Sequence, residues 1–509
     1  LGAPPWAAAA AQDEWVTPER PAEYMIYQYP DIALVVRVDV PETGFGVRVL
    51  GPEDALVKSS GVPGRRIGPV FTYIDAVDLP RQLMIEVTPG HAIPRSAIGL
   101  EVLQFAAGDR NAAALSRAYR LFSLGTETAL SDDTTSWAMK TYSLRNAAEL
   151  FDQLGMEEMR LWAEYFAAHQ VLHQLEDRLM AMELAQEIQR AAVRAGFEEV
   201  ALAARALEGD ALLQQLTATT TSRIDYPGLH ERLQGLAALA GRLGFAAEAG
   251  RAYYKDGLVF DHQGEPRQAL EQYERALEVI AHTADPELLN EVRATAATAH
   301  EALGSTSGAL AMLDDIAGEL AAGPQAEAAL ELADRLLEKG RLLNANYRYR
   351  DAASELTRAL ELQQASAANR SWGPTGLELA WARYSLGRAE EAIALIQEAL
   401  PRTPPEGNAE LLARAYGSLA NMHRARGRFE QAAQARETQG TLVGEGEGRA
   451  ELLFETAMDA RQRHGPASRE AREMLRWSRQ AAAGEGDRLT EARAALQLCL
   501  LGAEGGGEP

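Results

Sequence analysis

The stretch YYKDGLVFDHQGEPRQALEQYERAL, residues 253–277, places a small residue, a turn and an Ala-rich amphipathic segment in a fixed order. Its turn lies at Gly264, and equivalent turn positions follow at Gly304, Tyr347, Gly387 and Gly427. The successive gaps are 40, 43, 40 and 40 residues. A period of this size predicts stacked helical hairpins rather than one globular core.

Small residues recur where the two helices of a predicted hairpin must approach closely. Gly257 lies twelve residues before Ala269, and three further pairs have this spacing: Gly340 and Ala352, Ala380 and Ala392, and Ala420 and Ala432. Seven residues beyond three of the second-helix alanines lie Ala276, Ala359 and Ala399, with Tyr273, Leu356 and Ile396 between. Because a bulkier side chain would separate the helices, this ladder predicts close helix-on-helix packing.

The pattern resembles the tetratricopeptide (TPR) repeat family, whose signature is W-x2-L-G-x2-Y followed by Ala, Phe, Ala and often Pro. Pro404 falls at the final Pro position. Arg293 and Gly376 depart from the first aromatic position, and Arg436 and Gln439 break the last helix of the pattern. HEAT and armadillo repeats share a length of about forty residues, but they explain the small-residue ladder less well.

The resemblance also indicates where a partner binds, since the first helix of a TPR hairpin lines the concave groove. The positions left free by packing are Tyr254, Arg341, Asn344, Trp381, Tyr384, Asn421 and Arg424. Asn and Arg side chains can bond the backbone or the carboxylates of an extended peptide, and Trp and Tyr offer flat apolar contact. Packing between repeats and solvation are the alternative roles of these side chains.

Composition agrees with a soluble, mainly helical protein. Fifty Lys and Arg residues against 73 Asp and Glu give a net charge of −23. Such acidity disfavours nucleic acid and anionic membranes as partners, because phosphate binding needs a compensating basic surface. No apolar run is long enough to cross a bilayer. The single cysteine, Cys499, excludes an internal disulfide. We expect no cofactor, and we favour a monomer.

Residues 23–108 differ in kind from the rest. Short β-branched or aromatic runs are separated by Gly, Pro and Asp: YMIYQY at 24–29, DIALVVRVDV at 31–40, GFGVRVL at 44–50, PVFTYI at 69–74, QLMIEVTP at 82–89 and SAIGLEVLQF at 96–105. These runs predict a small all-β sandwich of six to eight strands. After Asp109 the pattern becomes helical, and less regular hairpins continue through Gly155 and Gly196.

The first residues, LGAPPWAAAAAQDEW, have an A-x-A shape ending at Ala11, like the site left by signal-peptidase cleavage. This start predicts a periplasmic or secreted protein, with a disordered Ala-rich lead and a cytoplasmic protein as the alternative. Together with the β region and the long repeat array, it resembles bacterial secreted proteins that carry a C-terminal CHAT domain, a caspase-like cysteine peptidase. The resemblance is to the non-catalytic N-terminal part of such proteins.

The residues give little support to an enzyme. Cys499 lies in AALQLCLLG, a predicted amphipathic helix that would bury the thiol, and His464-Gly465 lies at a predicted helix end. Neither is the strand-end arrangement in which an imidazole activates a thiolate. His169 and His173 stand at i and i+4, as in a helical zinc site, but Gln170 takes the place of the general-base Glu. Structural metal binding there, with Glu176, is the weaker alternative to ordinary packing.

The expected layout is therefore mainly α, a TPR-like α-α superhelix preceded by the all-β sandwich. Its parts are a leader or signal-peptide remnant at 1–22, the sandwich at 23–108, irregular hairpins at 109–240, regular repeats at 241–440, terminal helices at 441–500 and a flexible tail at 501–509.

Three hypotheses about function follow. The leading one is a non-enzymatic scaffold that binds a peptide or protein in the concave groove. The second is the recognition or regulatory arm of a CHAT-type peptidase whose catalytic domain is absent from this chain. The third is a β-sandwich that binds carbohydrate or a cell surface, motivated by Tyr24, Tyr27 and Tyr29.

Overall fold

The structure is a computed structural model in which the chain forms two compact units, Leu1–Ser305 (unit 1) and Thr306–Pro509 (unit 2). It describes residues 15–40, 44–60, 67–90, 93–106, 110–126, 134–218, 224–281, 283, 285–322, 326–365, 372–443, 448–465 and 468–504. The start at residues 1–12, on which the export prediction depends, and the end of the predicted tail at 505–509 lie outside these ranges.

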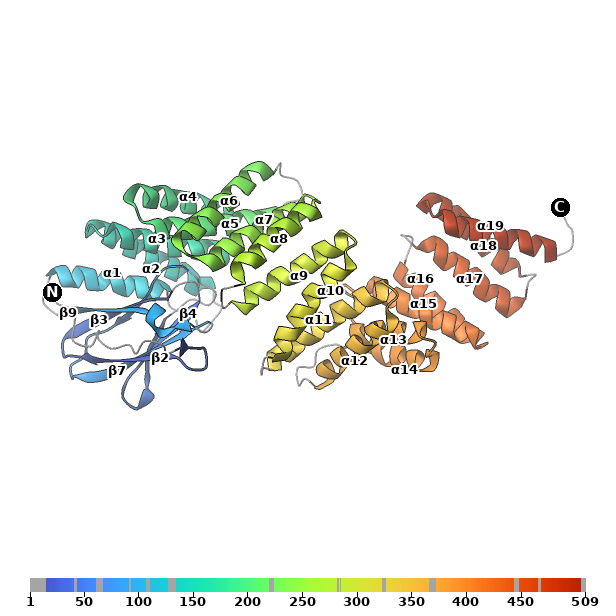
Figure 1. Cartoon of the computed structure of the whole chain (residues 1–509), viewed down its shortest axis with the longest axis horizontal. Coiled ribbons are helices and arrows are strands. Elements are labelled where there is room, and N and C mark those ends of the chain that lie inside the picture. Colours follow the sequence, from blue (N-terminus) through green and yellow to red (C-terminus); the bar gives the residue numbers. More distant parts are fainter. Residues whose placement is uncertain are drawn as a thin grey trace. The chain divides into compact units, whose positions relative to one another are not determined.

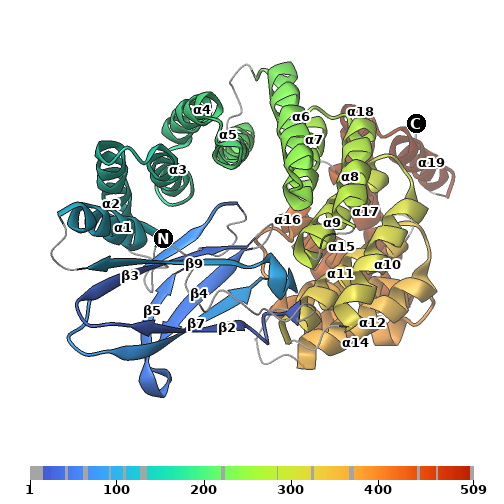
Figure 2. The same ribbon diagram turned by 60° about the vertical axis from the view of Figure 1, so that its left-hand side comes forward.

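Unit 1 opens with nine antiparallel strands (Figures 1 and 2). They are β1 Trp15–Val16, β2 Ala22–Gln28, β3 Ile32–Asp39, β4 Phe45–Leu50, β5 Leu56–Ser60, β6 Val70–Ile74, β7 Arg81–Pro89, β8 Ile93–Pro94 and β9 Gly99–Ala106. The sheet orders are β2-β7-β4-β5, β6-β3-β9 and the short pair β1-β8. Each of the six predicted runs overlaps one of these strands, so the antiparallel β region is confirmed. In the described residues β1, β5 and β8 lie outside those runs, which brings the strands to nine rather than the predicted six to eight.

The three-stranded sheet is buried on both faces. Leu34, Val36 and Val38 of β3 share a core with Val47 of β4 and Leu83 of β7 in the four-stranded sheet. The alternate β3 residue Val35 belongs instead to a cluster with side chains of the first helices. A strand covered on both faces reads as a nearly continuous apolar run, which accounts for the sequence DIALVVRVDV.

Two exposed aromatic side chains lie on β2 and just after its end. Tyr27 and Tyr29 are 50% and 57% exposed, and their rings lie 5.1 Å apart in an edge-to-face arrangement. Tyr24 is half-buried, with the Arg95 guanidinium 5.0 Å from its ring centre. The three predicted tyrosines therefore divide into an exposed pair and one packed ring.

Helices form the rest of both units (Figure 1). Those of unit 1 are α1 Arg110–Thr126, α2 Thr134–Gln153, α3 Glu157–His173, α4 Arg178–Ala195, α5 Glu198–Ala218, α6 Tyr226–Leu243, α7 Ala246–His262, α8 Pro266–Ile280 and α9 Pro286–Ala302. Those of unit 2 are α10 Thr306–Ala322, α11 Ala326–Ala345, α12 Tyr349–Ala365, α13 Gly373–Ser385, α14 Ala389–Ala399, α15 Ala409–Ala425, α16 Phe429–Val443, α17 Arg449–His464, α18 Arg469–Glu485 and α19 Arg488–Glu504. Short 3-10 helices lie at Pro52–Asp54, Arg95–Ala97 and Leu400–Arg402.

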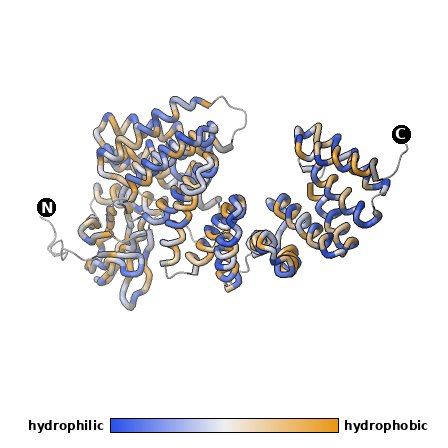
Figure 3. The backbone as a smooth tube through the Cα atoms, turned by 45° about the vertical axis from the view of Figure 1, so that its right-hand side comes forward, coloured by the Kyte–Doolittle hydropathy of each residue, from blue (hydrophilic) through white to orange (hydrophobic). Residues whose placement is uncertain are grey.

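The helices form the predicted TPR-like superhelix. Within each unit, every helix packs against its neighbours in sequence, and odd-numbered helices such as α3 and α5, or α11 and α13, also contact one another. Figure 3 shows apolar and polar residues interspersed along the helices, as expected for amphipathic elements. No helix in the described ranges is long and apolar enough to cross a membrane.

The ladder of small residues lies where it was predicted, between the two helices of each hairpin. Its second-helix members Ala269, Ala352, Ala392 and Ala432 are completely buried. A Cβ atom built on Gly257 would overlap the Tyr273 ring, and one on Gly340 would overlap Leu356. Such overlap costs about 1–3 kcal/mol when the helices cannot shift, so glycine is needed at these two positions.

All five repeated turn residues have left-handed backbone conformation, as do Gly155 and Gly196. The repeated turns follow odd-numbered helices, whereas Gly155, Gly196 and Gly244 follow the even-numbered helices α2, α4 and α6. Helix α7 therefore has such a turn at both ends, at Gly244 and Gly264. The turn spacing predicted the joints between helices but not this change in which helix precedes the turn.

Tyr347 is the one of the five repeated turn residues that is not glycine, and it adopts φ 60° while 80% exposed. A side chain in the left-handed region costs about 1–2 kcal/mol, so Tyr347→Gly should raise the free energy of unfolding of unit 2 by about 1 kcal/mol. Gly387→Tyr, at the equivalent turn, should lower it. Denaturant unfolding of the full chain measures both changes, and a destabilised Tyr347→Gly variant would contradict this account.

Candidate binding cleft on helices α4, α5 and α6

The residues predicted to line a groove all lie on odd-numbered helices. Tyr254 is on α7 in unit 1, whereas unit 2 holds Arg341 and Asn344 on α11, Trp381 and Tyr384 on α13, and Asn421 and Arg424 on α15. Six of the seven thus occupy three successive odd-numbered helices of one unit.

Arg341 and Asn344 converge on Glu378 of α13, whose side chain is only 4% exposed. The Asn344 amide donates to Glu378 Oε2 and to its carbonyl oxygen, both at 3.1 Å, and Arg341 Nε lies 3.6 Å from Oε1. Arg414 of α15 pairs with the same carboxylate from the other side. The buried Glu378 carboxylate therefore links three odd-numbered helices.

Arg424 is held in a similar way by the next odd-numbered helix, α17. Its guanidinium lies 2.8 Å from Glu455 Oε2 and 3.0 Å from Asp459 Oδ1. Arg436 of α16 bonds Asp459 Oδ2 at 3.1 Å, and Asn421 Oδ1 accepts bonds from both arginines. The prediction that Arg436 and Gln439 break the last helix is therefore wrong: α16 continues past both. Each nitrogen of the buried Arg436 guanidinium has an acceptor, and Gln439 Oε1 is one of them.

The aromatic candidates are half-buried. The Trp381 and Tyr384 rings lie 6.0 Å apart on α13. The Tyr254 hydroxyl lies 3.2 Å from Thr295 Oγ1, and burial raises the pKa of Tyr254 to about 12. The polar candidates are thus bonded within the array, and binding of a partner by these seven residues stays a prediction.

These contacts predict unequal effects of the two arginines on stability. Arg424 is 18% exposed, so Arg424→Gln should lower the free energy of unfolding of unit 2 by about 2 kcal/mol, because two buried carboxylates lose a charged donor. Arg341 is 45% exposed and Arg414 remains on Glu378, so Arg341→Gln should cost less than about 1 kcal/mol. Equal losses in denaturant unfolding would contradict these assignments.

His423 lies beside this network on α15 and is 4% exposed. Burial, followed by the nearby Arg428 and Arg426, lowers the pKa of His423 from its ordinary value of 6.5. As the pH falls, His423 therefore binds a proton at a higher pH in the unfolded chain than in the folded chain.

By linkage, the stability that neutral His423 contributes is fully present above about pH 6.5. It is lost as the pH falls toward the pKa of His423 in the folded protein. We expect the melting temperature of unit 2 to fall between neutral and mildly acidic pH, and His423→Leu to reduce that fall. Thermal unfolding at several pH values measures it, and an unchanged slope in the variant would refute the assignment.

The other sequence candidates are far less connected. His169 and His173 lie on α3 with ring centres 4.3 Å apart, and the described part of the chain contains no group of three or more His, Cys, Asp and Glu side chains suited to a metal. Cys499 is exposed on α19, so the prediction of a buried thiol is wrong. The exposed imidazole of His464 lies 3.5 Å from Glu470.

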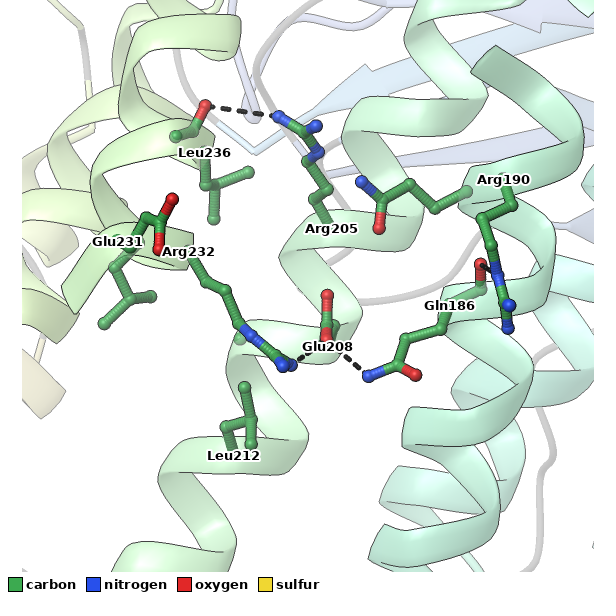
Figure 4. Close-up of a pocket in the computed structure, with 12 residues that line it drawn as sticks. Gln186, Arg190, Arg205, Glu208, Leu212, Glu231, Arg232 and Leu236 are labelled. Carbon is green, nitrogen blue, oxygen red and sulfur yellow. Dashed lines mark hydrogen bonds and ion pairs between the residues drawn. The ribbon is translucent and has the colours of Figure 1, made fainter. Parts of the chain in front are cut away.

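A hollow lined by charged and apolar side chains lies elsewhere, on α4, α5 and α6 of unit 1. Helix α4 packs closely along α5, whereas α6 contacts α5 much less extensively. The space holds about 580 Å³ and is lined from all three helices (Figure 4). It adjoins a hollow of about 930 Å³ reaching toward α3 and a smaller one of about 250 Å³ at the other end. We call these three hollows together the cleft.

Glu208 of α5 ties the middle of the cleft together. It is 7% exposed, and its Oε1 accepts a 2.8 Å bond from Gln186 of α4 and an ion pair from Arg232 of α6. Figure 4 shows Glu208 between these two side chains. One buried carboxylate therefore connects both neighbouring helices to the central one.

Three other arginines in the cleft lack such a partner. Among the described residues, no carboxylate lies within ion-pairing distance of Arg190, Arg194 or Arg205. Arg190 and Arg194 donate to backbone carbonyl oxygens one turn earlier on α4, at 3.1 and 3.2 Å. Arg205 Nη1 lies 3.5 Å from the Gly235 carbonyl oxygen. When the Gln189 amide is oriented with its oxygen toward Arg205, that oxygen accepts from Arg205 Nε at 2.6 Å. All these acceptors are neutral, so the three positive charges are not balanced locally.

The cleft has a charged end and an apolar end. Arg194, Arg190, Gln186 and Met182 follow at four-residue intervals on α4 and therefore lie on one face of that helix. Because α5 is antiparallel to α4, its residues follow the cleft in the opposite chain direction. Arg205 lies at the charged end and Leu212 at the apolar end. The small hollow beyond has five apolar side chains in its lining, Met182, Leu212, Leu216, Ile224 and Leu229, together with Gln186, Gln215, Asp225 and Arg232.

None of these residues was among the sequence candidates. They lie before the regular repeats, where the small-residue ladder sets no register. One signal was present: Arg190 and Arg194 are four residues apart in an amphipathic helix, so their side chains neighbour one another. That signal does not show the absence of a carboxylate partner, which depends on distant helices.

No protein-family model matches this chain, and no curated protein matches its sequence. Among solved structures, it is similar to the apo form of the quorum sensor NprR from B. thuringiensis, with 17% identity, a TM-score of 0.40, and 72% of this chain and 97% of that chain covered. The apo form of RapI is 9% identical with a TM-score of 0.49, and the match covers 68% of this chain and 98% of RapI. A tetratricopeptide repeat protein from Parabacteroides merdae is 17% identical with a TM-score of 0.37, and the match covers 58% of this chain and 98% of that one. These are similarities of helical-repeat architecture.

Proposed function

We propose that this chain is a non-enzymatic protein-interaction scaffold that holds a partner protein in the cleft on α4, α5 and α6. The observation that carries the proposal is the set of three arginines, Arg190, Arg194 and Arg205, with only neutral partners in an open cleft of a chain with net charge −23. Elsewhere in the array, buried guanidinium groups such as that of Arg436 are paired with carboxylates. A partner that supplies carboxylates would complete the arrangement.

The fold suits this role physically. Helical repeats present an extended surface whose shape depends on contacts between neighbouring helices. Because Glu208 fixes both α4 and α6 to α5, the walls of the cleft are held in place before a partner arrives. A site already formed loses less conformational entropy on binding, which favours affinity.

Charge reversal on the exposed face of α4 tests the proposal. We expect full-length chain bearing Arg190→Glu and Arg194→Glu to lose a partner that the unaltered chain captures from its source cells, because the cationic wall becomes anionic. The partner is identified by mass spectrometry and purified, and its dissociation constant is then measured by calorimetry.

The matched control is Arg476→Glu with Arg479→Glu on α18. Both control residues are exposed, no ion-pairing carboxylate lies near them among the described residues, and the double change alters the net charge equally. Circular dichroism confirms that both variants are folded. The proposal fails when every captured protein binds all three chains with the same affinity.

A further inference from the structure

We infer that the cleft recognises an extended acidic peptide segment of five or six residues that carries carboxylates at one end and an apolar side chain at the other. This inference rests on the proposed function and specifies the partner's chemistry. It follows from three properties of the cleft: its charge, its length and its apolar end.

The charge of the lining selects an anion. The two larger hollows are lined by five arginines and four glutamates. Arg160 pairs with Glu164 at 2.6 Å, and Arg232 pairs with Glu208. Arg190, Arg194 and Arg205 remain, against the exposed Glu187 and Glu231. The hollow of about 930 Å³ at the charged end, with four arginines and two glutamates, is therefore net positive, although the chain as a whole is strongly negative.

Guanidinium groups bind carboxylates through two parallel hydrogen bonds. Arg190 and Arg194 each use only Nε for their neutral partner, so both Nη groups of each remain available as donors. Arg205 donates to Gly235 through Nη1 and to Gln189 through Nε and Nη2. The positive region is short, and the net charge of −23 repels a long polyanion. These features favour a few carboxylates over a nucleic-acid backbone.

The length of the cleft sets the length of the ligand. From Arg194 to Met182 the lining follows α4 for twelve residues, or roughly 18 Å at 1.5 Å per residue. An extended peptide rises about 3.3 Å per residue, so five or six residues cover this distance. Carboxylates facing Arg190 and Arg194 would then lie four or five residues from a side chain near Met182.

The far end of the cleft suits that side chain. Its hollow of about 250 Å³ is lined by Met182, Leu212, Leu216 and Leu229 as well as by the polar Gln215, Asp225 and Arg232. Burying one leucine there would strengthen binding, because its apolar surface is removed from water. Charge at one end and apolar contact at the other fix the position of the ligand along the cleft.

The test uses synthetic peptides and the full chain. The probes are fluorescent hexapeptides with blocked ends, Leu-Ser-Gly-Ser-Glu-Glu and the reverse sequence, because the cleft does not fix chain direction. Fluorescence anisotropy should show binding of at least one of them to the unaltered chain and to the Arg476→Glu, Arg479→Glu control. The Arg190→Glu, Arg194→Glu variant should bind about tenfold more weakly or worse.

Two further comparisons locate the peptide. Replacing its two glutamates by lysines should abolish binding to the unaltered chain. Replacing its leucine by alanine should weaken binding severalfold, and this loss should be smaller in a Leu212→Ala variant, because both changes remove the same contact. A loss of unchanged size would place the leucine outside the apolar end and overturn that part of the inference.

The outcomes separate this inference from the proposed function. Failure of both hexapeptides to bind, while the captured partner still depends on Arg190 and Arg194, overturns the acidic-peptide inference and leaves the scaffold function standing. Absence of both kinds of binding overturns both. The inference is also overturned by equal weakening in the α18 control, or by tighter binding of a single-stranded oligonucleotide through the same arginines.

Discussion

Close contact between antiparallel helices is the constraint on which the rest of the structure depends. At Gly257 and Gly340 the neighbouring helix lies where a Cβ atom would be, and the alanines of the ladder are completely buried. Each hairpin therefore supplies a thin, well-packed unit whose outer surfaces are available to its neighbours. The cleft lies where this contact is loose, because α6 contacts α5 much less extensively than α4 does.

Electrostatics has a structural role in the same array. Buried carboxylates such as Glu378 and Asp459 each accept from arginines on different helices, which joins hairpins far apart in sequence. Other arginines of this acidic chain, such as Arg232 and Arg436, are ion-paired. Arg190, Arg194 and Arg205 bond neutral acceptors instead, and all three line one cleft.

Much of the fold could be predicted from the sequence because it depends on short-range patterns. The ladder from Gly257 to Ala432 and the turns from Gly264 to Gly427 involve residues within one hairpin, so their spacing is visible in the chain. Around α7 the turns change from following even-numbered helices to following odd-numbered ones, and this was not predictable. A left-handed glycine indicates where one helix ends, but not which of the two alternating helices precedes it. The exposure of Cys499 was missed for a related reason: α19 shows little difference between its faces.

The site was harder to predict because it depends on what the arginines do not contact. Arg341 and Arg424 have the residue type and helix position expected of groove residues, but Glu378, Glu455 and Asp459 lie more than thirty residues further along the chain and meet them only after folding. A substitution at Arg424 therefore changes stability together with any binding. Arg190 and Arg194 are exposed and bond only their own helix, so their charge can be changed with little cost to the fold. For that reason the function of this surface is best tested on α4, where binding and folding can be measured separately.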